Sequence, residues 1–166
     1  MTSTASLTSD GAVYLGFDYG ARRIGVAVGD AVTWLARPLP TIANAREPDW
    51  AALTRVLRDW RPRAAIVGLP VDLDGNEQAI TGQARAFAEQ LRIRFGIPVH
   101  FCDERMSSRA ADDEIRSARA DGRKTRRVRK GERDGVAARL ILEQWLAEQR
   151  VRPSAVAAEL SIPNPQ

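Results

Sequence analysis

The sequence is poor in the residues that build disulfides and zinc sites. It has one cysteine, Cys102, and one histidine, His100, among its 166 residues. A single cysteine cannot form an internal disulfide, and one cysteine with one histidine cannot complete a structural zinc site. No apolar run approaches the roughly 20 residues that span a membrane, and residues 1–12 lack the basic start and apolar centre of a secretory signal. We therefore expect a cytoplasmic protein with no membrane association.

The remaining composition indicates one ordinary globular domain. Hydrophobic residues make up 44% of the chain and charged residues 28%, a balance that supports a sizeable core. Residues 1–12, rich in Ser and Thr, are predicted to form a disordered leader. Residues 151–166, with three prolines, are predicted to form a flexible tail. The domain is therefore predicted to span residues 13–150.

Hydrophobic patterning predicts strands that alternate with helices. The predicted strands cover residues 13–18, 23–28, 34–42, 64–69 and 98–102. The predicted helices begin at Asp49, near residue 80, at Ser107 or Ser108, and near residue 132. The strand at 34–42 is the least secure, because Pro38 and Pro40 interrupt it. This order predicts an α/β domain with a mixed five-stranded sheet and helices on both faces, which is the element order of the RNase H-like fold.

The second predicted strand has one face made only of small residues. Gly25, Ala27 and Gly29 alternate with Ile24, Val26 and Val28. A face without bulky side chains allows something to approach the backbone closely. The short link from the first strand predicts that these two strands form an antiparallel hairpin.

Asp18 ends the first predicted strand, which is otherwise apolar. A charge at the end of a buried strand is costly unless it is paired or bound to a metal. Two-metal cleavage of a phosphodiester requires such carboxylates, because Mg²⁺ and Mn²⁺ prefer oxygen ligands. The alternative interpretation is a turn aspartate that supports Tyr19 and Gly20.

Asp134 lies at the start of the last predicted helix. Steps of four, seven and eleven residues lead from it to Ala138, Ile141 and Trp145. Its carboxylate therefore shares a face with residues that pack on the sheet. A favourable interaction with the helix dipole would explain its position along the helix but not this inward direction.

Glu104 and Asp103 compete for a third position just after the fifth predicted strand. Strand alternation puts them on opposite faces, so only one can point at the site. His100 and Cys102 share this strand and are predicted to be structural or neutral. Asp30 and Asp74 lie in predicted loops and are weaker candidates. For Asp74 the following Gly75 makes a turn the first interpretation.

Positive charge is concentrated in one segment. Residues 116–133 contain nine Lys or Arg and two acids. Such a segment suits a polyanionic partner, although a solvated loop without a partner is the alternative. The residues predicted to contact phosphates are Arg123, Lys124, Arg126, Arg127, Arg129 and Lys130.

Five stretches together resemble one known family. They are LGFDYGARRIGVAVGD at 15–30, ARPLPTI at 36–42, IVGLPVDLDGNEQAIT at 66–81, FCDERMSSRAADD at 101–113 and DGVAARLILEQWL at 134–146. In this order they resemble the YqgF family, also called RuvX. Its members are described as pre-16S rRNA nucleases and formerly as Holliday junction resolvases.

The resemblance implies an RNase H-like fold, a divalent cation (Mg²⁺ or Mn²⁺), and three catalytic and metal-binding acids that match Asp18, Glu104 and Asp134. It thereby favours Glu104 over Asp103. It also implies a cytoplasmic enzyme that matures the 5′ end of 16S rRNA within the small-subunit precursor. Arg22 and Arg23 match the family's basic positions after the first acid and are expected to bind nucleic acid. Gly29, where the family often has Ser, and Arg133, where an apolar residue is usual, are departures that remove no ligand.

Three other functions deserve comparison. Resolution of four-way DNA junctions would use the same acids on branched DNA, and it favours a homodimer over a monomer because two symmetric cuts are needed. A non-catalytic nucleic-acid-binding module is disfavoured because all three acids are present. Phosphotransfer of the actin-like or sugar-kinase type would need a second lobe, for which the chain is too short.

Overall fold

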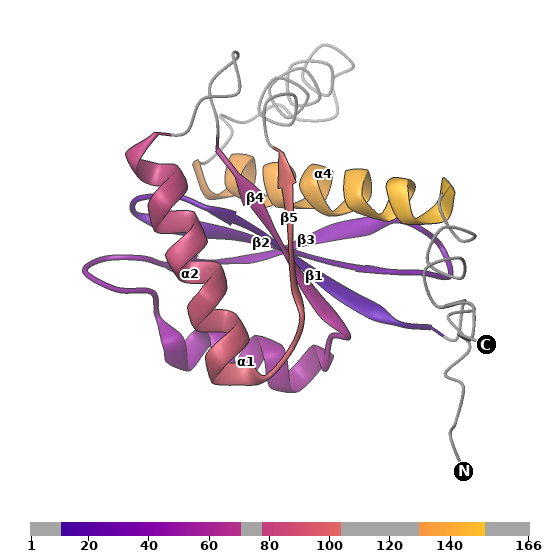
Figure 1. Cartoon of the computed structure of the whole chain (residues 1–166), viewed down its shortest axis with the longest axis horizontal. Coiled ribbons are helices and arrows are strands. Elements are labelled where there is room, and N and C mark those ends of the chain that lie inside the picture. Colours follow the sequence, from indigo (N-terminus) through magenta and orange to yellow (C-terminus); the bar gives the residue numbers. More distant parts are fainter. Residues whose placement is uncertain (1–10, 71–77, 104–129, 152–166) are drawn as a thin grey trace, which may run out of the picture.

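The computed structural model describes residues 11–70, 78–103 and 130–151. Five strands form a single mixed sheet in the order β3-β2-β1-β4-β5 (Figure 1). These are β1 (Val13–Tyr19), β2 (Arg23–Asp30), β3 (Ala36–Ala43), β4 (Ala64–Leu69) and β5 (Val99–Asp103). The first three strands pair antiparallel, whereas β4 lies parallel to both β1 and β5. The predicted hairpin and the mixed sheet are confirmed.

Helices cover both faces of the sheet, as the sequence predicted. On one face lie α1 (Trp50–Trp60) and α2 (Ala79–Phe95), and on the other lies α4 (Lys130–Val151). Each face has its own hydrophobic cluster. One cluster joins Leu15 and Phe17 of β1 to α1 and α2, and the other packs Ile141 and Leu142 of α4 against the sheet. None of the helices in the described ranges is long and apolar enough to span a membrane.

Capping residues set the ends of α1 and α2. The Asp49 carboxylate accepts a hydrogen bond from the Ala52 amide at 3.1 Å and caps α1. At the other end, Arg61 adopts the left-handed conformation with φ 44° and donates its amide to the Leu57 carbonyl. Gly96 ends α2 in the same way with φ 63°.

Strand β3 explains how two prolines fit into a sheet. It lies at the sheet edge, where only one side must supply backbone donors. Its register with β2 shifts between Ile24 and Val26, so an irregularity accommodates the segment around Pro40. The predicted helix after Ser107 lies outside the described residues, and the leader and tail beyond 11–151 likewise stay predictions.

Candidate active site

Asp18 stands between two glycines in the middle of the sheet. It is partly buried, and its Cα pairs with Gly25 of β2 and Gly68 of β4. Gly68 in turn pairs with Cys102 of β5, which is buried in the cluster beneath α4. Paired residues on neighbouring strands turn their side chains to the same face. The Asp18 carboxylate therefore faces α4 with no side chain directly beside it on either neighbouring strand.

Asp134 reaches this position because α4 crosses β2 at a glycine. A Cβ added to Gly25 would lie 2.1 Å from the Asp134 carbonyl oxygen and 3.2 Å from the Asp134 Cβ. Only a residue without a side chain allows such an approach. Because Gly25 is the strand partner of Asp18, the backbone of Asp134 lies over the residue beside Asp18. The small face predicted for β2 is thus occupied by α4.

Arg23 supplies a counter-charge for Asp134. Its Nε lies 3.2 Å from the Asp134 Oδ2, and the two side chains are 35% and 25% exposed. The two residues are 111 positions apart in the sequence. Arg23 and Gly25 share a face of β2 because they are two residues apart. Arg23 was expected to bind nucleic acid, and in this structure its guanidinium is paired with a candidate catalytic acid.

A buried asparagine that sequence reasoning missed holds the turn between Asp18 and Arg23. The Asn44 side-chain amide donates to the Gly20 carbonyl at 2.7 Å, and its backbone amide donates to the Arg22 carbonyl at 2.9 Å. Asn44 is only 4% exposed. An asparagine after a strand is typical of a surface turn, so the sequence offered no signal for this role. Arg22 itself is exposed.

On β5, the two acids at the strand end can be separated by face. Cys102 lies on the α4 side, whereas Phe101 lies on the opposite side, with the Arg85 guanidinium of α2 5.4 Å from its ring centre. Asp103 follows the parity of Phe101. The described end of β5 therefore turns Asp103 away from the face that carries Asp18.

Asp30 and Asp74 were the weaker acidic candidates. Asp30 supports a turn, because its carboxylate accepts the amides of Val32 and Thr33 at 2.9 and 2.7 Å. The Thr33 amide bond is the main cause that lowers the pKa of Asp30. Asp74 lies outside the described residues. Of the two residues predicted to be structural or neutral, Cys102 is buried, whereas His100 is exposed and stacks on Trp145 with ring centres 5.4 Å apart.

Comparison with known proteins assigns the family. The sequence profile described as "RuvX: Holliday junction resolvase" matches residues 12–148. The chain belongs to the RuvX family. A relative from Legionella pneumophila subsp. pneumophila, named "Putative pre-16S rRNA nuclease", is 48% identical over 137 residues, which are 82% of this chain and 96% of the relative. A relative of the same name from Xanthomonas axonopodis pv. citri is 47% identical over 148 residues, 89% and 94% of the two chains.

Solved structures confirm the RNase H-like fold. "T. thermophilus RuvC in complex with Holliday junction substrate" aligns with a TM-score of 0.52 at 22% identity and covers 84% of this chain and 96% of its own. The yeast mitochondrial Holliday junction resolvase Ydc2 aligns with a TM-score of 0.51 at 10% identity and covers 90% and 84%. At these identities the likeness concerns the fold alone.

In this RuvX-family chain, the described residues bring together two of the three predicted acids, Asp18 and Asp134. Within those ranges no group of three or more metal-ligating side chains occurs, and the third predicted acid, Glu104, lies outside them. Oxygen ligands from a strand and a helix fit Mg²⁺ or Mn²⁺ better than a softer metal. In this structure the Asp134 carboxylate is paired with the Arg23 guanidinium.

The predicted nucleic-acid contacts in the basic segment fall almost wholly outside the described residues. They are Arg123, Lys124, Arg126, Arg127 and Arg129. Lys130 is the first residue of α4. The segment therefore leads directly to the helix that carries Asp134.

Proposed function

We propose that this RuvX-family protein is a cytoplasmic, metal-dependent nuclease that cleaves phosphodiester bonds at the 5′ end of the 16S rRNA precursor. The observation that carries the proposal is the convergence of Asp18 and Asp134 at Gly25. Two partly buried carboxylates so close together suit a divalent cation, because like charges otherwise repel. The names of the Legionella and Xanthomonas relatives support the rRNA substrate.

Glu104 is the third acid of this proposal. Asp103 lies on the face opposite to Asp18, and strand alternation predicts that the next residue points to the same face as Asp18. Three carboxylates from β1, the end of β5 and α4 would then surround one position. Mg²⁺ or Mn²⁺ bound there would act as a Lewis acid on the scissile phosphate.

Residues around the acids would position the site, balance its charge and bind the substrate. Asn44 fixes the turn after Asp18 and thereby positions Arg22 and Arg23 beside the site. Arg23 neutralises part of the charge of Asp134. Arg22 is exposed and can contact a substrate phosphate. Such contacts orient the substrate without reading its sequence.

The basic segment is proposed to guide the substrate to α4. Replacing Arg126, Arg127 and Arg129 by alanine should weaken binding to all sequences. Each lost phosphate contact lowers the slope of log K against log salt by about 0.7 to 0.9, so the triple variant should lose roughly two to three units. Binding titrations at several salt concentrations measure this slope, and an unchanged slope would mean that the segment is only solvated.

A second candidate is resolution of four-way DNA junctions, which the description of the matching family profile favours. That activity needs a two-fold dimer so that two cuts fall symmetrically. A protein that is monomeric at working concentration would count against it.

One experiment tests both functions. The purified protein receives the 16S rRNA precursor and a four-way DNA junction side by side, with Mg²⁺, Mn²⁺ or a chelator. We expect metal-dependent cleavage of the RNA that Asp18→Asn, Glu104→Gln and Asp134→Asn each reduce at least ~10²-fold. Cleavage of only the junction would select the second function. Full activity in chelator, or in any of the three variants, would contradict the proposed site.

A further inference from the structure

A pocket of about 310 Å³ lies at the end of the domain remote from Asp18. It is lined by Thr54, Leu57, Arg58, Arg61, Pro62, Phe95 and Ile97. Pro62 and Ile97 precede the parallel strands β4 and β5, whereas Asp18 pairs with Gly68 near the carboxyl end of β4. The pocket also lies on the face covered by α1 and α2, and α4 covers the other face. It is therefore separate from the candidate active site.

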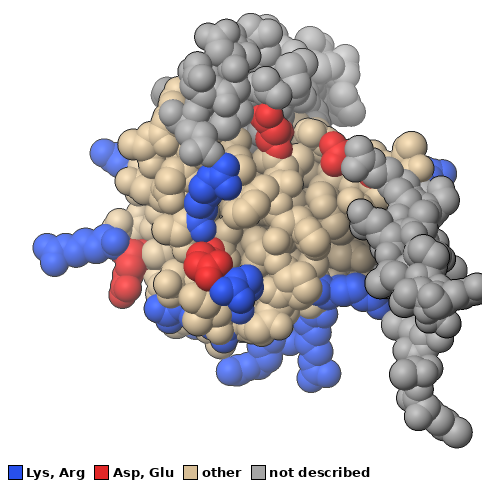
Figure 2. Space-filling view, in the orientation of Figure 1, with Lys and Arg blue, Asp and Glu red and all other residues tan. Residues whose placement is uncertain are grey.

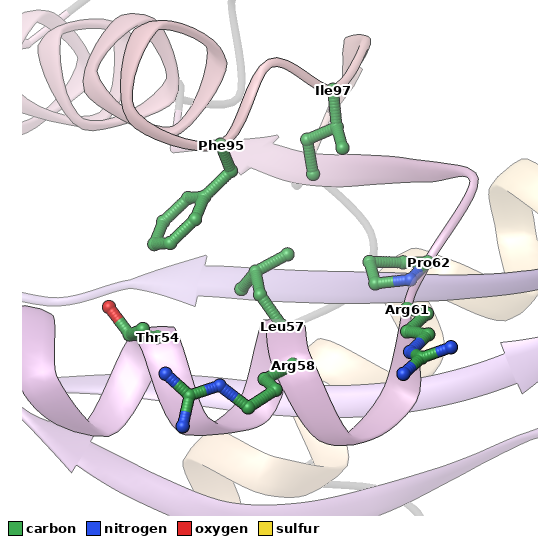
Figure 3. A pocket seen from close by; sticks show the side chains of 7 residues that line it. All are labelled: Thr54, Leu57, Arg58, Arg61, Pro62, Phe95 and Ile97. Atoms are coloured by element: carbon green, nitrogen blue, oxygen red, sulfur yellow. The ribbon is translucent and has the colours of Figure 1, made fainter.

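The pocket combines an apolar interior with a basic rim. Leu57 and Pro62 are buried and Phe95 is half-buried, whereas Arg58 and Arg61 are exposed. Figure 3 shows the side chains of Leu57 and Phe95 pointing toward one another, with both arginines on the α1 side. Among the described residues, neither arginine forms an ion pair with a carboxylate. An apolar slot beside two guanidinium groups suits a ligand that carries both a flat ring and an anion.

The backbone at Arg61 gives a second, independent indication. Arg61 ends α1 with φ 44° and ψ 61°, the left-handed conformation that glycine adopts most easily. The equivalent position at the end of α2 is Gly96, with φ 63° and ψ 29°. A side chain in this conformation costs free energy that glycine would avoid. Strain of this kind at a pocket rim points to a function of the side chain.

The surroundings of the pocket are basic as well. Residues 55–63 contain four arginines and one acid, Asp59. In Figure 2, blue side chains gather along the lower edge of the molecule, where Figure 1 draws α1. Positive charge around an apolar slot favours a polyanion over a neutral ligand.

We propose that this pocket is a second nucleic-acid subsite, which holds one unpaired base of an RNA strand between Leu57 and Phe95 and its phosphate at Arg58 and Arg61. The identity of the ligand rests on the proposed nuclease function, but its binding requires neither metal nor cleavage. Because the subsite lies at the far end of the other face, it engages a part of a structured RNA different from the part that is cut.

The test uses the full chain without metal and a fluorescently labelled five-nucleotide RNA, rA5, in anisotropy titrations. Arg61→Gly removes the guanidinium but keeps a residue suited to the left-handed cap, so its thermal midpoint should equal or exceed that of the wild type. Its affinity for rA5 should fall about tenfold, and Arg58→Gln with Arg61→Gly should lower the salt slope by about 1.4, which is twice the 0.7 expected for each single-strand phosphate contact.

Arg55→Gln is the matched control, because Arg55 is exposed on α1 and does not line the pocket. It removes the same charge and should change rA5 affinity less than twofold. Phe95→Leu should weaken rA5 more than rU5, since adenine has the larger stacking surface.

Equal losses in Arg55→Gln and Arg61→Gly would show that only general surface charge matters and would overturn the subsite. Unchanged affinity in Arg61→Gly would also overturn it, as would displacement of rA5 by a polyglutamate peptide at equal concentration, which would indicate an acidic protein partner. Absence of cleavage with intact rA5 binding would refute the nuclease function alone.

Discussion

Replacing Gly25 by alanine would place a methyl group where α4 crosses β2. The added Cβ would lie 2.1 Å from the Asp134 carbonyl oxygen and 2.6 Å from its carbonyl carbon. An ordinary contact begins at 3.4 Å, so the first part of α4 would have to move by the difference of 1.3 Å. The added Cβ is held rigidly on the β2 backbone and meets backbone atoms of α4, so no side-chain rotation can relieve the clash.

The expected cost follows from this geometry. Overpacking of a close-packed core costs about 1–3 kcal/mol, and a clash of a Cβ with backbone atoms, which cannot rotate away, belongs at the upper end. For a chain of this size, 3 kcal/mol lowers the thermal midpoint by roughly 6–12 °C. A displacement of about 1 Å in a catalytic group also costs about 10²-fold in rate. We therefore expect Gly25→Ala to lose stability and cleavage together.

Thermal unfolding and cleavage assays at 20 °C, where the variant remains folded, measure the two effects separately. Gly82→Ala is the matched control, because Gly82 lies in α2 and an added Cβ would meet nothing within 4 Å. That variant should gain about 0.5–1 kcal/mol from helix propensity and cleave normally. A Gly25→Ala midpoint within 2 °C of the wild type would refute the close crossing, and normal cleavage by a destabilised variant would remove Asp134 from the site.

Other substitutions test individual contacts. Arg23→Gln should tighten Mn²⁺ binding about 1.5- to 5-fold in calorimetric titrations. The reason is that the partly exposed ion pair between Arg23 and Asp134 opposes binding of a second cation by about 0.2–1 kcal/mol. Weaker Mn²⁺ binding would mean that Arg23 orients the carboxylate for the metal. Folding lowers the pKa of Asp30 below its unfolded value of 3.8, so the ionised carboxylate stabilises the wild type above pH 3.8, and this stability is lost as the pH falls through the folded-state pKa. Asp30→Asn should remove this contribution. Superimposable curves of stability against pH for the two proteins would contradict the expectation. Asp103→Asn should impair cleavage far less than Glu104→Gln, and equal losses would show that the face assignment on β5 is wrong.

The sequence predicted the parts of the site that depend on local pattern. Alternating small residues in β2 indicated a face whose backbone can be approached closely, and α4 occupies it at Gly25. Helical spacing from Asp134 to Ile141 and Trp145 indicated the face that packs on the sheet, and both of those residues are buried there. These features depend only on the repeat of a strand or a helix, which can be seen in the spacing of residues along the sequence.

The remaining parts depend on contacts between distant segments. The pairing of β1 with β4 could not be predicted from local sequence, because it reflects the packing of whole layers. The ion pair of Arg23 with Asp134 was not predicted, since nothing near Arg23 in the sequence indicates a partner 111 positions away. Asn44 was missed for the same reason, because its importance comes from the turn it contacts and not from its own neighbours.

The site is complete only after segments far apart in the sequence have packed together. Asp18 and Arg23 lie in a hairpin whose contacts are local, but Asp134 joins them only when α4 packs on β2. That packing depends on close approaches of α4 at Gly25 and Gly16 and on the cluster around Ile141 and Leu142. Any opening that separates α4 from the sheet therefore removes one carboxylate and leaves the rest of the sheet paired. The free energy of docking α4 sets the fraction of molecules with an assembled site. In variants that weaken this interface, the protection of the α4 amides against hydrogen exchange and the cleavage rate should therefore fall together.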